Sequence, residues 1–204
     1  MKNVLLLILT ACVLAAGYWL YVVINAPIEF NTSAEIRKTA VVEKIKDIRI
    51  AQRAYKRVKG QFAPSFDSLV NFINNDSIQY EIKMGSADDS VAVAEGRVKT
   101  IIKMIAAKDT VFGSRDVKIE ELSLIPYGNG AEFKMSATII ETGNQGVKVP
   151  VFCATAEYKT YLGDLPNGQE LVNLYDFDKT VGNFPGIKVG SLERATNDAG
   201  NWED

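Results

Sequence analysis

Residues 32–60 show the apolar periodicity of an α-helix. Apolar side chains recur every three or four positions and predict one apolar face, formed by Val41, Ile45, Ile48, Ala51, Tyr55 and Val58. Thr32 and Glu35 have the spacing of a capping box at a helix start. Gly60 is suited to end the helix, because glycine enters the left-handed conformation without steric cost. We therefore predict a single amphipathic helix from Thr32 to Gly60, about 40 Å long.

A second apolar segment precedes this helix. Residues Val4–Ile24 carry no charge and would form a helix about 31 Å long, close to the thickness of the hydrocarbon core of a bilayer. Aromatic residues near its end match the belt that forms at membrane surfaces: Tyr18, Trp19 and Tyr21. Pro27 then predicts a break in the helix. We predict a transmembrane anchor and connector over residues 1–31 and an α+β head over residues 32–204.

The charge next to the apolar segment favours one orientation. Lys2 is the only charge before it, which predicts a cytoplasmic N-terminus and a periplasmic head on a single-pass protein of the inner membrane. Two processed forms are alternatives: a lipoprotein lipidated at Cys12, after Leu9-Thr10-Ala11, and a signal peptide cleaved near Ala15-Ala16-Gly17. The apolar run continues well past both positions, which favours an uncleaved anchor.

The remaining pattern predicts a short helix followed mainly by strands. Ser65 is placed to cap a helix whose apolar residues follow at helical spacing, and Leu171–Thr180 predicts another helix. Strands are predicted at Ile78–Met84, Val98–Ala107, Glu120–Pro126, Glu132–Thr142, Val147–Leu162 and Ile187–Leu192. Turns are expected at Tyr127–Gly130 and Gly143–Gly146, a polar loop at Asp88–Ser90, and a loosely held tail from Glu193. We expect one antiparallel sheet of four to six strands, packed with one face on the long helix.

Basic residues gather on the predicted long helix. Residues 35–59 contain nine Lys and Arg against three Asp and Glu, a net charge of +6, whereas residues 60–204 contain thirteen against twenty-one, a net charge of −8. Four of them form a row opposite the apolar face: Lys46, Arg49, Arg53 and Lys56. We expect this row to contact acidic residues of the chain, of another copy, or anionic lipid; a solvated helix face is the alternative. Nucleic acid is not expected, because no aromatic residues interleave the row.

The sequence predicts no catalytic, cofactor or metal site. It contains no histidine, the usual general base and metal ligand. Residues Leu174–Val181 resemble the first motif of haloacid-dehalogenase-type phosphatases, in which Asp176 would be the nucleophile and Asp178 the general acid and base. That motif opens its fold, however, and too little of this chain follows it. We interpret the segment as a solvated turn or helix end.

Several short motifs resemble the end of the long helix in type IV pilins and type II secretion pseudopilins: Ala51-Gln52, Ala54-Tyr55, Gly60-Gln61-Phe62 and Ser65–Leu69. In those families a membrane-inserted helix continues into a stalk that ends at glycine, and a small antiparallel sheet packs on its outer half. The resemblance implies this pilin-like arrangement. Prepilins also carry a Gly-Phe cleavage motif and a glutamate in the apolar segment, and Met1–Ile24 has neither.

Other stretches of the chain resemble a family of single-pass envelope proteins from Bacteroidota: Pro27–Asn31, Lys46–Arg49, Ile125–Tyr127, Val147–Phe152, Pro185–Gly190 and Asn201–Glu203. We predict a non-enzymatic, membrane-anchored envelope protein that serves as a structural or scaffold subunit of an envelope-spanning assembly. The alternative is a membrane-tethered periplasmic binding module for a peptide or a cell-wall ligand. The expected partners are the bilayer and proteins, or further copies, that contact the stalk helix or a sheet edge.

Overall fold

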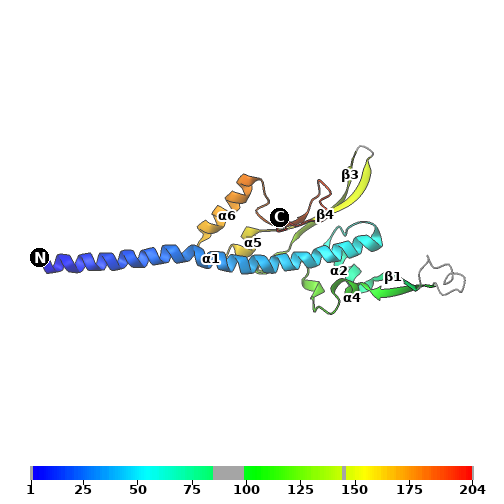
Figure 1. Cartoon of the computed structure of the whole chain (residues 1–204), viewed down its shortest axis with the longest axis horizontal. Helices are drawn as coiled ribbons and strands as arrows, with labels where there is room; N and C mark the ends of the chain where they lie inside the picture. Colours follow the sequence, from blue (N-terminus) through cyan, green and yellow to red (C-terminus); the bar gives the residue numbers. More distant parts are fainter. Residues whose placement is uncertain (1, 85–98, 144–145, 204) are drawn as a thin grey trace.

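The computed structural model describes residues 2–84, 99–143 and 146–203 and shows an α+β chain built on one long helix. Helix α1 covers Lys2–Lys59. Its first part, residues 2–24, projects from the rest of the molecule and is called the bare part of α1 below (Figure 1). The other elements cover its second part from two sides. Helices α5 and α6 and strands β3 and β4 lie on one side, and helices α2 and α4 with strand β1 on the other. The expected α+β class with a long N-terminal helix and antiparallel sheets is confirmed.

Helix α1 does not break at Pro27, so the predicted break is wrong. Proline removes one N–H but its fixed φ is compatible with a helix, and the surrounding turns stay helical. Thr32 is likewise no N-cap, because its hydroxyl lies within the helix and donates to the Ile28 carbonyl over 2.9 Å. Gly60 does end the helix, with a φ of 78° and its N–H donating to the Lys56 carbonyl. The division of the chain at residue 31 stays a prediction.

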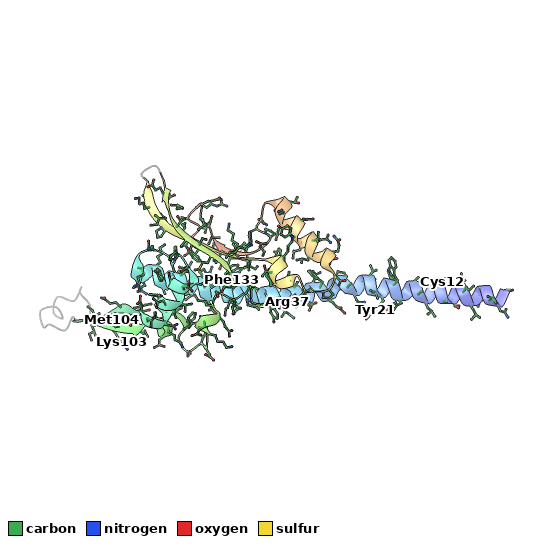
Figure 2. All side chains as sticks on the ribbon, turned by 180° about the vertical axis from the view of Figure 1, so that it is seen from behind. Cys12, Tyr21, Arg37, Lys103, Met104 and Phe133 are labelled. Atoms are coloured by element: carbon green, nitrogen blue, oxygen red, sulfur yellow. The ribbon has the colours of Figure 1, made fainter. Side chains whose placement is uncertain are left out.

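The bare part of α1 is long and apolar enough to cross a membrane. Its described side chains between Val4 and Ile24 are exposed, Cys12 and Tyr21 among them (Figure 2). The covered part of the same helix is different: Val41, Ile45, Ile48 and Ala51 are fully or almost fully buried. The predicted apolar face is thus confirmed at these four positions, whereas Val58 is largely exposed.

One side of α1 is covered by two helices and a two-stranded sheet. Helix α2, Phe66–Asn75, begins at the predicted N-cap Ser65, whose hydroxyl accepts from the Ser68 N–H. Strands β1, Ser77–Met84, and β2, Lys99–Ala106, pair antiparallel and lead into helix α4, Ala107–Phe112. The predicted loop at Asp88–Ser90 lies outside the described residues. Tyr55 meets the Phe72 ring edge-on from α1, which anchors α2 to the long helix.

The other side is covered by a three-stranded antiparallel sheet in the order β3-β4-β5, so the expectation of one sheet of four to six strands is wrong. Its strands are Lys134–Thr142, Val147–Glu157 and Gly186–Gly190. Two helices connect β4 to β5: α5, Tyr158–Leu162, and α6, Gly168–Val181. The predicted strand Val147–Leu162 therefore ends early, because its last apolar residues have helical spacing and are buried as a helix.

The predicted strand Glu120–Pro126 is also wrong. Residues Ile119–Glu121 form a 3-10 turn and Leu124 makes only an isolated bridge to Glu132. The buried residues are Ile119, Leu122 and Ile125, a spacing of three that suits a 3-10 turn and not the alternation of a strand.

The C-terminal segment is held against the body of the molecule, contrary to the expectation of a loose tail. Gly200 bridges to Val189 of β5. The Asn201 side chain donates to the Gly186 carbonyl over 2.8 Å and accepts from the Lys188 N–H over 3.0 Å. These contacts attach residues 197–203 along the outer edge of the three-stranded sheet.

Candidate functional site

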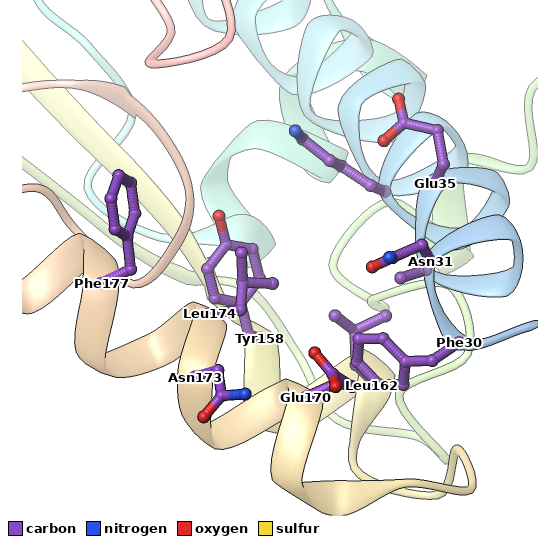
Figure 3. Close-up of a pocket in the computed structure, with 11 residues that line it drawn as sticks. Phe30, Asn31, Glu35, Tyr158, Leu162, Glu170, Asn173, Leu174 and Phe177 are labelled. Atoms are coloured by element: carbon purple, nitrogen blue, oxygen red, sulfur yellow. The ribbon is translucent and has the colours of Figure 1, made fainter. Parts of the chain in front are cut away.

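A groove of about 590 Å³ lies between α1 and α6, with α5 as its floor (Figure 3). Its apolar lining comes from Phe30, Ala34, Tyr158, Leu162, Leu174 and Phe177. Its polar lining comes from Asn31, Glu35, Lys38, Glu170 and Asn173. Ligand sites in proteins are concave, mostly apolar and about 300–1,000 Å³ in volume, and this groove has that size and character.

Helix α6 forms one wall of the groove; both of its ends are fixed, and Leu171 and Leu174 pack against the core. Asn167 precedes it in the left-handed conformation, with a φ of 66°, and its side-chain amide donates to the Ala26 carbonyl over 2.9 Å. Gly182 ends the helix with a φ of 83°. No residue between these ends is buried, and Phe177 is 64% exposed. The helix therefore presents apolar side chains that the described chain does not cover.

The groove begins close to the end of the apolar segment Val4–Ile24. Phe30 is 2% exposed, and Arg37 holds the connection between α5 and α6 by an ion pair with Asp164 and by a hydrogen bond to the Tyr161 carbonyl over 2.8 Å. The pair also lowers the pKa of Asp164, chiefly through the hydrogen bond from Arg37. One wall of the groove and the exposed apolar part of the helix belong to the same continuous helix, α1.

A smaller polar pocket of about 190 Å³ adjoins the groove and shares Lys38 and Tyr158 with it. Its other lining residues come from α6, β5 and the C-terminal segment: Asp178, Asn183, Gly186, Ile187, Asn201 and Trp202. The ring nitrogen of Trp202 is buried and has no hydrogen-bond partner in the described part of the chain. A buried donor without an acceptor is costly, so the packing around the Trp202 ring must offset this cost.

Charges of both signs face the groove and the pocket. Lys38 forms no ion pair with any described residue, and Asp178 of α6 lines the same pocket. Burial raises the pKa of Tyr158 well above its usual value, and the neighbouring Asp178 carboxylate raises it further. Burial likewise raises the pKa of Tyr161. Both phenols therefore stay protonated at neutral pH, and the charges available to a ligand are those of the carboxylates and of Lys38.

The predicted basic row lies beside the C-terminal segment of the same chain. Arg49 donates to the Glu203 carboxylate over 2.6 Å and stands 5.7 Å from the Trp202 ring. Arg53 donates to the Asp198 carboxylate over 3.1 Å. Two members of the row thus attach the tail that also completes the polar pocket.

The other two members of the row lie elsewhere. Lys46 pairs with Glu43 on the same helix over 3.6 Å. Lys56 stands 4.6 Å from the Phe62 ring, which packs on Phe152. The row is therefore divided among the C-terminal segment, the helix itself and the Phe62 ring, and its role toward a separate partner stays a prediction.

Asp176 and Asp178 lie within α6 and do not follow a strand, so they lack the context of the phosphatase motif. Asp176 is exposed, and only Asp178 faces the pocket. None of the groove residues was predicted as a site. The sequence contained one indication of the groove, the apolar positions of the predicted helix Leu171–Thr180. These positions predicted the helix but did not show that its apolar side chains stay exposed.

Comparison with protein-family models, curated proteins and solved structures finds no match to this chain. The groove, the pocket and the attached C-terminal segment are therefore the features from which a function is inferred. The groove and the pocket are both enclosed by elements that are far apart in the sequence, and both lie beside α1. Such a space can bind a ligand that is partly apolar and partly polar.

Proposed function

We propose that this chain is a membrane-anchored binding module of the bacterial envelope, with the groove between α1 and α6 as its binding site. The observation that carries this proposal is a mostly apolar groove of about 590 Å³ whose wall, α6, has no buried residue. Exposed apolar surface of this kind marks a site of contact with a ligand or partner. The proposed role of the module is binding.

The bare part of α1 would serve as the anchor. It is long and apolar enough to cross a membrane, and Lys2 at its start favours a cytoplasmic N-terminus with the head in the periplasm. Because α1 continues without a break into the head, the groove would lie at a fixed height above the bilayer. The ligand would therefore be a component of the envelope found close to the inner membrane.

A photo-crosslinking experiment in native membranes tests this function. A photoreactive amino acid replaces Phe177, which faces the groove, or Asp176 next to it, which is exposed but lines neither cavity. We expect an adduct of defined mass at position 177 and none at position 176. Equal labelling at both positions, or none at 177, would contradict a binding groove.

A second function, the structural or scaffold subunit, is favoured by a different observation. Strands β1 and β2 form a sheet of their own, and within the described residues neither pairs with a further strand. Ile101, Ile102 and Met104 are exposed there, and free edges with apolar residues are templates for association. The pilin-like resemblance of the stalk points to the same role.

Cysteine cross-linking tests this second function. Met104→Cys should join copies in native membranes through a homobifunctional thiol reagent, whereas Lys108→Cys on α4, also exposed, should not. Equal cross-linking at the two positions would show collision and not assembly.

A further inference from the structure

We infer that the groove and the polar pocket together hold one phospholipid with a zwitterionic ammonium–phosphate headgroup, one of its acyl chains in the groove and its headgroup in the pocket. This inference rests on the proposed binding function and names its ligand. Three properties support it: the height of the groove, the order of its apolar and polar parts, and the charges at its far end.

The groove lies at the height of the bilayer surface. Phe30 is six residues beyond Ile24, or about 9 Å along a helix, and the headgroup layer extends about 5–8 Å beyond the hydrocarbon core on each side. Asn167, which precedes α6, contacts the helix at Ala26, still closer to the apolar segment. A lipid could therefore enter the groove without leaving the membrane surface completely.

The apolar and polar parts follow one another in the order that a lipid requires. Phe30 and Leu162 line the end nearest the apolar segment, and Lys38 lies about 12 Å farther along α1. Leu174 and Phe177 extend the apolar wall along α6 toward the pocket (Figure 3). An acyl chain in the groove would run back toward the bilayer, with its headgroup in the pocket. Covering Phe177 would remove apolar surface from water, which is the main driving force for such binding.

The charges match a headgroup that carries both signs. Lys38, which lines both the groove and the pocket, is a donor suited to a phosphate. Asp178 in the pocket, with Glu35 and Glu170 at the groove, are acceptors suited to an ammonium group. A purely anionic headgroup would meet three carboxylates against one lysine. The surrounding charge thus favours an ammonium–phosphate lipid over an anionic lipid of the same chain length.

A second copy of the chain does not fit the groove. The exposed apolar and basic surface around Lys103 and Met104 lies at the opposite end of the molecule from Cys12 (Figure 2). Lys59, where α1 ends, is about 43 Å farther along the helix than Phe30. Copies anchored in one membrane keep these surfaces at different heights, so one copy cannot place its β1–β2 sheet in the groove of the next.

Trp202 provides a direct readout, because the chain has two tryptophans and Trp19→Phe leaves only the one that lines the pocket. The full chain with this substitution, in non-ionic detergent, is titrated with phosphatidylethanolamine and with phosphatidylglycerol of identical acyl chains. Emission of Trp202 and native mass spectrometry report the bound lipid. We expect phosphatidylethanolamine to bind about tenfold more tightly, as the loss of one charge-assisted contact implies.

Matched variants show whether the charged residues of the pocket cause the preference for phosphatidylethanolamine over phosphatidylglycerol. Lys38→Gln and Asp178→Asn should each weaken phosphatidylethanolamine binding about tenfold, while Asp176→Asn on the same helix should leave it unchanged. Because Lys38 and Asp178 come from different elements, misfolding of one variant leaves the other as a test. Equal affinity for both lipids, or no effect of either variant, would overturn the inference.

A third titration distinguishes failure of the phospholipid inference from failure of the proposed binding function. If a basic amphipathic peptide changes the emission of Trp202 and neither lipid does, the groove binds but the phospholipid inference is wrong. If no probe binds and Phe177 gives no photo-adduct, the binding function is wrong as well.

Discussion

Gln52 holds the backbone of Ala63 through both of its amide atoms. Its Nε2 donates to the Ala63 carbonyl over 3.0 Å, and its Oε1 accepts from the Ala63 N–H over 2.8 Å. Both residues are fully buried. The two bonds hold the chain against α1 directly after Gly60 and so, together with the Tyr55–Phe72 contact, fix where α2 begins.

Gln52→Leu should therefore destabilise the fold far more than the removal of an exposed amide. It leaves a buried N–H and a buried carbonyl without partners, each at a cost of about 1–3 kcal/mol, so we expect the free energy of unfolding to fall by about 2–6 kcal/mol. Denaturant unfolding of the full chain in detergent measures it. The control is Gln169→Leu, which removes an exposed amide bonded to Asn173; equal losses would show that the clamp at Ala63 is not structural.

The contact between Gly200 and the Trp202 ring predicts a steric effect. A Cβ at position 200 would lie 2.3 Å from the ring, so Gly200→Ala must displace the Trp202 ring from its present position. We expect a red-shifted emission of Trp202 in the Trp19→Phe background and faster digestion of the C-terminus by carboxypeptidase. Gly168→Ala is the matched control, because a Cβ there meets nothing within 4 Å. An unchanged spectrum for Gly200→Ala would refute the placement of the ring.

Attachment of the C-terminal segment should depend on pH. The Gly200 N–H lowers the pKa of Glu203, and Arg49 lowers it further. A carboxylate whose pKa is lowered in the folded state stabilises that state above its ordinary pKa and loses this effect as the pH falls through the lowered value. Emission of Trp202 should thus be constant at neutral pH and change below about pH 4. Glu203→Gln should reduce this change; an identical transition in that variant would assign it to another group.

The anchor can be tested at Cys12, which lies exposed on the bare part of α1. In native membranes of a Cys153→Ser variant, a membrane-impermeant maleimide should leave Cys12 unmodified, because lipid surrounds it, and should modify it after detergent extraction. Glu29→Cys, in an exposed position beyond the apolar segment, should react in both conditions if its side of the membrane is accessible. Labelling of Cys12 in intact membranes, or a chain that begins at Cys12 with acyl chains attached, would contradict the anchor.

The sequence predicted the elements whose pattern is local. The apolar face around Ile48, the end of α1 at Gly60 and the cap at Ser65 follow from spacing and from single-residue conformations, and all are confirmed. Glu120–Pro126 was mistaken for a strand because short apolar runs do not distinguish a strand from a 3-10 turn. Pro27 was read as a break although a long helix tolerates the loss of one hydrogen bond.

The groove could not be predicted in this way. Its walls come from residues 30–38, 158–162 and 170–177. The local sequence pattern of each segment does not show which helices pack next to one another. The tail was expected to be loose because its polar composition gives no apolar pattern, yet it is attached by Arg49, Arg53 and the backbone of β5. Ion pairs and side-chain contacts to a distant backbone leave no periodic signal in the sequence.

The relation between the groove and the bilayer is tested most directly by lipid-dependent quenching of Trp202. The Trp19→Phe chain is reconstituted in bilayers of phosphatidylethanolamine brominated near the carboxyl end of its acyl chains. Lys38, beside the pocket, is about 21 Å along α1 from Ile24, so bromines that stay in the bilayer are too far away to quench. We predict strong quenching relative to unbrominated lipid, abolished by Asp178→Asn and retained in Asp176→Asn. Equal emission in brominated and unbrominated bilayers would contradict a lipid in the groove.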